Sequence, residues 1–424
     1  MKRLGLLTAA LAIVAAACGA SINDSGTDTS AATTTASPTT GTTATPSPTT
    51  SGTDDSVSDA GNPTADELPP DLSIVVSPWP TNWAKRSIDL DELLVGIGAL
   101  DPRDLIRPID EPVYEDVTSA GDWLEDPEQG ILLEVAGEAI FYPIRILISH
   151  EIVNDQRGDV PFSLTYCPLC NTAAAFDRRV DGQVLRFGVS GLLRNSDLVM
   201  WDDATTSLWQ QINGEAIVGD FTGTQLEFLS TALIRWADFK ENHPDGDVLS
   251  RESGPFDYGT NGYLGYTSRG APFGNFFDSE KIDDRFEALS RVVGVRVDDA
   301  TKAYPFSTIS PIGAVNDELN GTPLAIWWGA PDTADALDAR RVADGQAIGT
   351  GIAFVREVDG QVLTFTANGD DTFTDAETGT TWNLLGRALD GPLTGTELEK
   401  ALHQNEFWFA WSAFNAGAPV YGLE

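Results

Sequence analysis

The stretch ILLEVAGEAIFYP at residues 131–143 returns as VGVRVDDATKAYP at residues 293–305, an offset of 162 (304 − 142 = 162). At the same offset, Val153-Asn154-Asp155 matches Val315-Asn316-Asp317. Other matching segments have larger offsets, namely Asp181–Leu185 with Asp359–Leu363, Thr222–Glu227 with Thr394–Glu399, and Trp236–Phe239 with Trp411–Phe414. A repeat of this length predicts the duplication of one domain-sized unit, not a solenoid of short repeats.

Each predicted half alternates apolar and polar residues over short runs that Gly, Asp and Asn interrupt, as in Phe162–Tyr166 and Leu198–Asp202. This period of two is typical of strands joined by turns. The expected helices lie around residues 143–148, 234–242 and 407–414. We therefore expect a β-rich α+β fold of two internally repeated halves, each a small antiparallel barrel or roll with one or two helices.

The N-terminus predicts export. Met1-Lys2-Arg3 precedes an apolar run that ends in small residues before Cys18. This order is typical of a secretory signal peptide, and the position of Cys18 resembles a bacterial lipobox, with an ordinary signal peptide as the alternative. Lipid on Cys18 would then be the protein's contact with the membrane, on the cell surface or the periplasmic side. The predicted segments are a signal peptide at 1–17, a disordered Thr/Ser/Pro-rich tether at 18–69, the first repeat at 70–250, a linker at 251–290 and the second repeat at 291–424.

The charge of the chain argues against some partners. It carries 64 acidic and 26 basic residues, which gives a formal net charge of −38. Because the acidic residues are spread along the chain, the folded part is not expected to bind nucleic acid or anionic lipid. A protein or small-molecule partner is left unspecified.

The candidate site centres on Cys167-Pro168-Leu169-Cys170. At the offset of 162 the two cysteines correspond to Gly329 and Asp332, and His150 corresponds to Ile312. Residues shared by both halves most simply serve the common fold, so residues found in one half are the functional candidates. The site is therefore expected in the first half.

Two thiolates two residues apart, with an imidazole, form a ligand set for a soft cation. Cys167, Cys170 and His150 are the predicted ligands of copper or zinc, and Met200 adds a thioether that favours copper. Residues expected to support this set are Glu151, Asp155, Arg194, Asn195 and Asp197. Arg194 and Asp197 have a second interpretation, a buried ion pair within the sheet.

Two other interpretations of the cysteines stay open. A CxxC pair can exchange disulfides, although no βαβ pattern precedes it, so a thioredoxin fold is not expected. A structural disulfide in an oxidising compartment is the other, and the protein would then be a surface binding or scaffold lipoprotein.

Several motifs, in order, resemble the domain of unknown function family 3179. They are Ser149–Asp155, Thr165–Cys170, Gly188–Met200, Ser207–Gln210 and Trp382–Ala388. The resemblance covers roughly residues 90–420 and implies no established activity. Two positions depart from the family pattern: Ser149 stands where Trp is usual, and Asn261-Gly262-Tyr263 replaces Asn-Pro-Tyr.

Overall fold

The computed structural model describes residues 68–423, so the predicted signal peptide, Cys18 and nearly all of the predicted tether lie outside the described residues. Within this range the protein is rich in strands and has few helices, as the sequence predicts. Across residues 68–423, no helix combines the length and apolar character needed to cross a membrane.

Three main sheets contain the strands before residue 250. The first has the order β1 (Leu94–Val95), β10 (Phe187–Arg194), β11 (Asp197–Asp202), β12 (Leu208–Gln210), β13 (Ala216–Val218). The second has the order β14 (Phe228–Leu229), β7 (Thr172–Asp177), β6 (Val160–Cys167), β5 (Ile152–Arg157). The third has the order β15 (Thr231–Arg235), β3 (Gln129–Val135), β4 (Glu138–Pro143), β16 (Asp247–Leu249), β2 (Tyr114–Asp116). A short hairpin joins β8 (Arg179–Val180) and β9 (Gln183–Val184).

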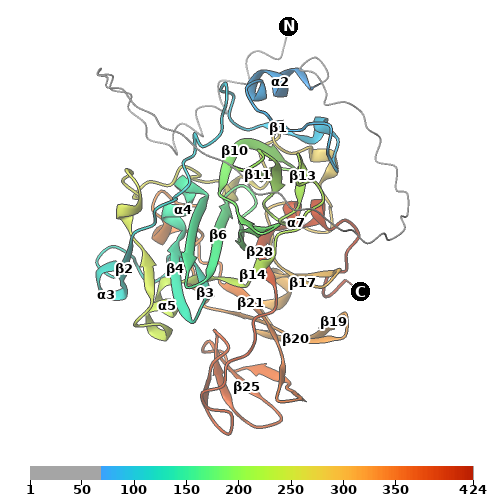
Figure 1. The fold of residues 1–424 in the computed structure, drawn as a ribbon. Coiled ribbons are helices and arrows are strands. Elements are labelled where there is room, and N and C mark those ends of the chain that lie inside the picture. The colour runs from blue at the N-terminus through green and yellow to red at the C-terminus, as the bar shows by residue number, and fades with distance from the viewer. Residues whose placement is uncertain (1–67, 424) are drawn as a thin grey trace, which may run out of the picture.

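The strands after residue 290 form smaller sheets. Their orders are β18 (Ala300–Pro305), β17 (Arg291–Val297), β28 (His403–Phe407); β19 (Ala314–Leu319), β20 (Thr322–Gly329), β21 (Thr350–Val355); β24 (Phe365–Ala367), β25 (Thr372–Asp375), β26 (Thr381–Asn383), β27 (Ala388–Asp390); and the pair β22 (Glu357–Val358), β23 (Gln361–Val362). Figure 1 shows β25 at the opposite end of the molecule from α2 (Pro70–Val76), the first helix of the described residues.

Of the two forms expected for each half, a small barrel or a roll, the barrel is wrong for the described residues, because none of these sheets closes on itself. A barrel requires its two edge strands to pair. Here the edge strands are mostly short and pair on one side only, as with β1 and β13. The sheets instead bury their apolar faces against one another, and one cluster of buried side chains joins residues from Ile97 to Ala410.

The three expected helices are present as α4 (Ile144–His150), α5 (Trp236–Asn242) and α7 (Trp408–Phe414). The described residues also form the unpredicted helices α2, α3 (Val117–Ala120) and α6 (Phe306–Ile309), with 3₁₀ turns η2 (Leu90–Glu92), η3 (Arg251–Ser253), η4 (Thr267–Arg269), η5 (Ser279–Lys281) and η6 (Val342–Asp344). A tryptophan opens both α5 and α7. Trp236 and Trp408 thus take the same position in their helices, whereas the sequence pattern pairs Trp236 with Trp411. The offset between Trp236 and Trp408 is 172 (408 − 236 = 172), the same as between the two Thr-Gly-Thr motifs (394 − 222 = 172).

Residues 131–143 lie in the β3–β4 hairpin, in which Ile131 faces Tyr142. The later copy forms the β17–β18 hairpin, in which Val293 faces Tyr304. The turns between the strands place Ala136 and Asp298 in the left-handed region, at φ of 53° and 50°. The two quoted stretches thus have the same local structure.

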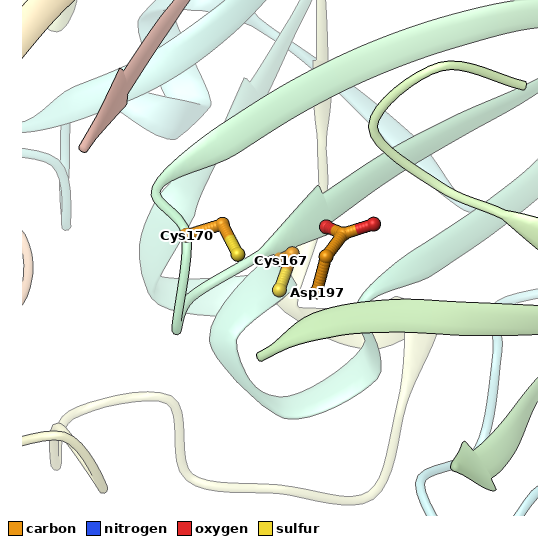
Figure 2. A group of neighbouring side chains, drawn as sticks. All are labelled: Cys167, Cys170 and Asp197. Carbon is orange, nitrogen blue, oxygen red and sulfur yellow. The ribbon is translucent and has the colours of Figure 1, made fainter. Parts of the chain in front are cut away.

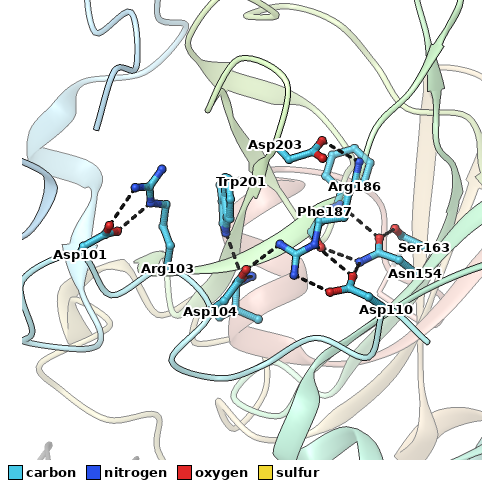
Figure 3. Close-up of polar contacts among 11 residues, drawn as sticks. Asp101, Arg103, Asp104, Asp110, Asn154, Ser163, Arg186, Phe187, Trp201 and Asp203 are labelled. Atoms are coloured by element: carbon cyan, nitrogen blue, oxygen red, sulfur yellow. Dashed lines mark hydrogen bonds and ion pairs between the residues drawn. The ribbon is translucent and has the colours of Figure 1, made fainter. Parts of the chain in front are cut away.

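Polar contacts hold the segment before β2 against β10 and β11. Arg186 lies between Asp104 and Asp110, with nitrogen–oxygen distances of 2.6 and 2.8 Å (Figure 3). Asn154 donates to the Asp110 carboxylate and to the carbonyl of Phe187, both at 2.8 Å. Asn154 belongs to the Val-Asn-Asp motif that occurs twice in the sequence. Its amide joins β5 to β10, and therefore connects the sheet that contains β6 and β7 with the sheet that contains β11.

Candidate metal centre

The cysteines lie in the connection of the β6–β7 hairpin. Cys167 ends β6 and faces Thr172, the first residue of β7. The N–H of Cys170 donates to the carbonyl of Cys167 at 3.3 Å, and Asn171 takes a left-handed conformation at φ 56°. Asn tolerates this region better than most residues, which lets the chain reverse directly after the second cysteine. A strand follows Cys170 instead of a helix, so the site lacks the helix N-terminus that lowers thiol pKa in thioredoxin-like proteins.

Side chains of the first half hold the base of this turn. Gln211 donates to Thr165 Oγ1 at 2.9 Å and accepts from Thr172 Oγ1 at 2.8 Å. Tyr166 Oη donates to Asn171 Oδ1 at 3.2 Å. These groups are buried, so each hydrogen bond satisfies a polar atom that water does not reach.

Residues beyond 250 hold the outer side of the turn. The N–H of Phe407 donates to the carbonyl of Cys170, and Asn171 Nδ2 donates to the carbonyl of Asn405, both at 3.0 Å. Tyr266, from the predicted linker, donates through its hydroxyl to the carbonyl of Leu169 at 2.9 Å. The turn that carries Cys167 and Cys170, here called the thiol turn, is therefore formed by residues before 250 and covered by Tyr266 and by β28.

Asp197 joins the two cysteines. Cys167 Sγ, Cys170 Sγ and a carboxylate oxygen of Asp197 all lie within 4.8 Å of one another (Figure 2). Asp197 begins β11 directly after the turn residues Asn195 and Ser196, both at positive φ. A two-residue turn of this kind is typical of a tight hairpin, and it brings the carboxylate to the cysteines.

All three side chains are buried: 2% of Cys167 is exposed, and none of Cys170 or Asp197. Asp197 Oδ2 accepts from Gln210 Nε2 at 2.6 Å and from the N–H of Ile212 at 3.0 Å. Its Oδ1 accepts no N–H or O–H hydrogen bond from residues 68–423. The thiol of Cys167 donates instead to the carbonyl of Ser196, at 3.8 Å.

Burial controls protonation at the site. It raises the pKa of Asp197 to about 7, against the opposing effect of the hydrogen bonds from Gln210 and Ile212. Burial also raises the pKa of Cys167, and it raises that of Cys170 well above the usual value. Without a cation, both thiols therefore hold their protons at neutral pH.

Two further buried carboxyls act on this group. Burial raises the pKa of Glu151 and of Glu406 to about 8, and the charge of Asp197 contributes in both cases. Glu151 is the C-cap residue directly after α4 and takes a left-handed conformation, at φ 59°. Its carbonyl accepts from the N–H of Tyr166. Glu406 lies on β28, so a carboxyl of the second half approaches the site.

The structure does not bring His150 into the group of Cys167, Cys170 and Asp197. One ring nitrogen contacts the carbonyl of Arg107 and the other the hydroxyl of Tyr258, each at 2.6 Å. Both nitrogens are therefore engaged elsewhere, and burial lowers the pKa of this histidine.

Met200, on β11, is fully buried and pairs with Val189 on β10 and Trp209 on β12. It lies three residues after Asp197 in an extended strand, so the two side chains point to opposite faces.

The other residues expected to support the site also have different partners. Asp155 accepts from Tyr114 Oη at 2.7 Å. Arg194 pairs with Glu92 at 2.8 Å and not with Asp197, so the expected ion pair between Arg194 and Asp197 is wrong. Asn195 is a turn residue before Asp197. Of the five expected residues, Asp197 lies with the thiols, and the charges of Asp197 and Glu151 raise the pKa of Cys167.

Sequence reasoning missed Glu406. At the offset of 172, Glu406 corresponds to Ile234, so it occurs in one half only. It also directly precedes the apolar run 407–411 that leads into α7. Both signals are visible in the sequence, but they lie far from the cysteines along the chain.

One family model matches the chain over residues 103–418, and its description is "Protein of unknown function (DUF3179)". No curated protein and no solved structure matches this chain.

Proposed function

Because this chain belongs to the DUF3179 family, whose description names no activity, we propose from the site that it binds a soft metal ion, copper or zinc, through Cys167, Cys170 and Asp197. The observation that carries the proposal is their mutual distance of at most 4.8 Å in a buried setting. Ligand atoms in a tetrahedral Zn²⁺ site, at about 2.0–2.3 Å from the ion, are separated by about 3.3–3.8 Å. The group therefore needs to contract by at most about 1 Å, which side-chain rotations can supply.

The chemistry of the group supports a cation more than thiol exchange. A thiol that exchanges disulfides is accessible and has a lowered pKa. Here both thiols are buried and have raised pKa values. A bound cation would replace the two thiol protons and would give the unpartnered Oδ1 of Asp197 a partner. Thiol–disulfide redox work, and a scaffold role with a structural disulfide, are the alternatives that the experiment separates.

The test is elemental analysis and thiol titration of the full-length protein after reconstitution with Zn²⁺ or Cu⁺. We expect about one metal per chain in the wild type and almost none in Cys167→Ser or Cys170→Ser, because two thiolates supply most of the affinity. Asp197→Asn is expected to weaken metal binding, because it removes the charge of one ligand. Its amide oxygen can still accept the hydrogen bonds from Gln210 and from the N–H of Ile212.

Met200→Leu is the matched control, because it changes a buried sulfur that points away from Asp197, and it is expected to retain the metal. His150→Gln is expected to do the same. No metal in the reconstituted wild type, with both thiols oxidised, would contradict metal binding and favour a disulfide. Loss of metal in His150→Gln would indicate that the imidazole of His150 is a metal ligand.

The metal-binding half and the second half are, we propose, copies of one unit, of which the second lacks the cysteines. The equivalent hairpins β3–β4 and β17–β18 support this. So do two equivalent indole contacts, from Trp209 to Asp202 at 2.9 Å and from Trp382 to Asp375 at 3.0 Å.

For localisation we propose an exported protein that lipid on Cys18 holds at the membrane, with no nucleic-acid partner. The support is the sequence before and around Cys18. Cys18→Ser is expected to move the protein from the membrane fraction to the soluble secreted fraction, because lipid anchoring depends on that thiol. Fractionation with an antibody to the folded part measures this. Retention of the variant in the membrane, uncleaved, would indicate an anchor other than lipid.

A further inference from the structure

The second half does more than support the fold. On β28, the N–H of Phe407 donates to the carbonyl of Cys170, and the carbonyl of Asn405 accepts from the side chain of Asn171. The residue between Asn405 and Phe407 therefore lies at the edge of the site. That residue is Glu406, which is 3% exposed. Its Oε2 has no hydrogen-bond partner within the described part of the chain. An acidic side chain buried in this way is costly unless a positive charge or a donor meets it.

The surroundings of Glu406 connect it with Asp197. A cavity of about 20 Å³ is lined by Glu406 and by Ile212, whose N–H binds the Asp197 carboxylate. This volume holds about one water molecule. Gly294 opens the space on the other side, since a Cβ there would lie 2.6 Å from Glu406 Oε1. Arg296 also lines the cavity, and its positive charge favours the ionised form of Glu406.

We propose that the metal is a divalent cation of the Zn²⁺ kind and that Glu406 is the positioning residue through which the second half selects it. This inference rests on the proposed function. Two thiolates alone satisfy Cu⁺, which prefers sulfur ligands and has a single charge. Zn²⁺ also accepts carboxylate oxygen and takes four ligands. Asp197 among the ligands and Glu406 beside them add negative charge. This charge stabilises a dication, whereas two thiolates already more than balance the single charge of Cu⁺.

The experiment compares Zn²⁺ and Cu⁺ affinities of the full-length protein by competition with a chromogenic chelator for each ion. Glu406→Gln keeps the size of the side chain and removes its charge. We expect it to weaken Zn²⁺ binding about 10–100-fold, as loss of an outer partner of a metal site does, and to leave Cu⁺ affinity unchanged. Glu241→Gln, on the exposed side of α5, is the matched control and should change neither.

Equal weakening of both ions, or unchanged Zn²⁺ affinity, would overturn the role of Glu406. Should Glu406→Gln fail to fold, Glu406→Asp decides the question, because it keeps the charge and withdraws it by one methylene. Zn²⁺ affinity should then fall while Cu⁺ affinity does not, and a parallel fall would again overturn the inference. If the wild type binds neither ion through its cysteines, the proposed function itself fails. Binding that depends on the cysteines but not on Glu406 overturns only this inference.

Discussion

Asp335→Asn is expected to lower the free energy of unfolding by roughly 3–5 kcal/mol, because it leaves the charge of Arg291 buried without a partner. The two side chains are 5% and 8% exposed, and their nitrogen–oxygen distance is 2.8 Å. Arg291 also lies over the ring of Phe407, at 5.0 Å from its centroid. Since the N–H of Phe407 binds the carbonyl of Cys170, the substitution should also loosen the thiol turn.

Urea unfolding of the metal-free protein measures this change. Asp344→Asn is the matched control, since Asp344 follows Asp335 in the same connection but is 56% exposed in its ion pair with Arg341. An exposed pair contributes less than about 1 kcal/mol, so the control should unfold close to the wild type. Equal effects of the two substitutions would contradict a special role for the buried pair.

The metal-free protein is expected to lose stability as the pH rises from 6.5 to 8. Burial raises the pKa of Glu151 and Glu406 from 4.5 to about 8. Between these pH values the folded protein holds protons that the unfolded chain has released, so the stability present below pH 4.5 is lost as the pH approaches 8. Each group then contributes a fall of roughly 1.4 kcal/mol per pH unit. Asp197, with a pKa of about 7, acts in the same direction up to that pH.

His403 has the opposite effect in a different range. Burial lowers its pKa from 6.5 to about 4, so it costs stability only as the pH falls below 6.5. Measurements at pH 6.5 and above therefore separate the glutamates from this histidine.

Denaturation midpoints at pH 6.5 and pH 8 measure the predicted loss. Glu406→Gln should fall less steeply than the wild type, whereas Glu241→Gln should follow it. A wild-type midpoint that does not change, or that rises, over this range would show that these carboxyls are ionised in the folded state.

Much of the fold could be predicted from residue order. The alternation in Phe162–Tyr166 predicted β6, and the helices near residues 234–242 and 407–414 are α5 and α7. Such elements depend on side-chain periodicity, which is local. Barrel closure was predicted wrongly because it depends on whether distant edge strands pair, and no local pattern records that.

The candidate site divides in the same way. The sequence by itself located the Cys167–Cys170 turn and predicted a soft metal as its ligand, because two thiols so near in sequence lie close together whatever surrounds them. Only the tertiary structure decided the third member. The sequence predicted His150 as a ligand and Asp197 as a supporting residue, but their positions depend on the β10–β11 hairpin and on Tyr258. The tertiary structure also decided that Glu406, 236 residues after Cys170 (406 − 170 = 236), borders the same site. The physical reason is that ligand geometry and burial arise from contacts between strands far apart in the chain, and a single sequence records those only where a repeat exposes them.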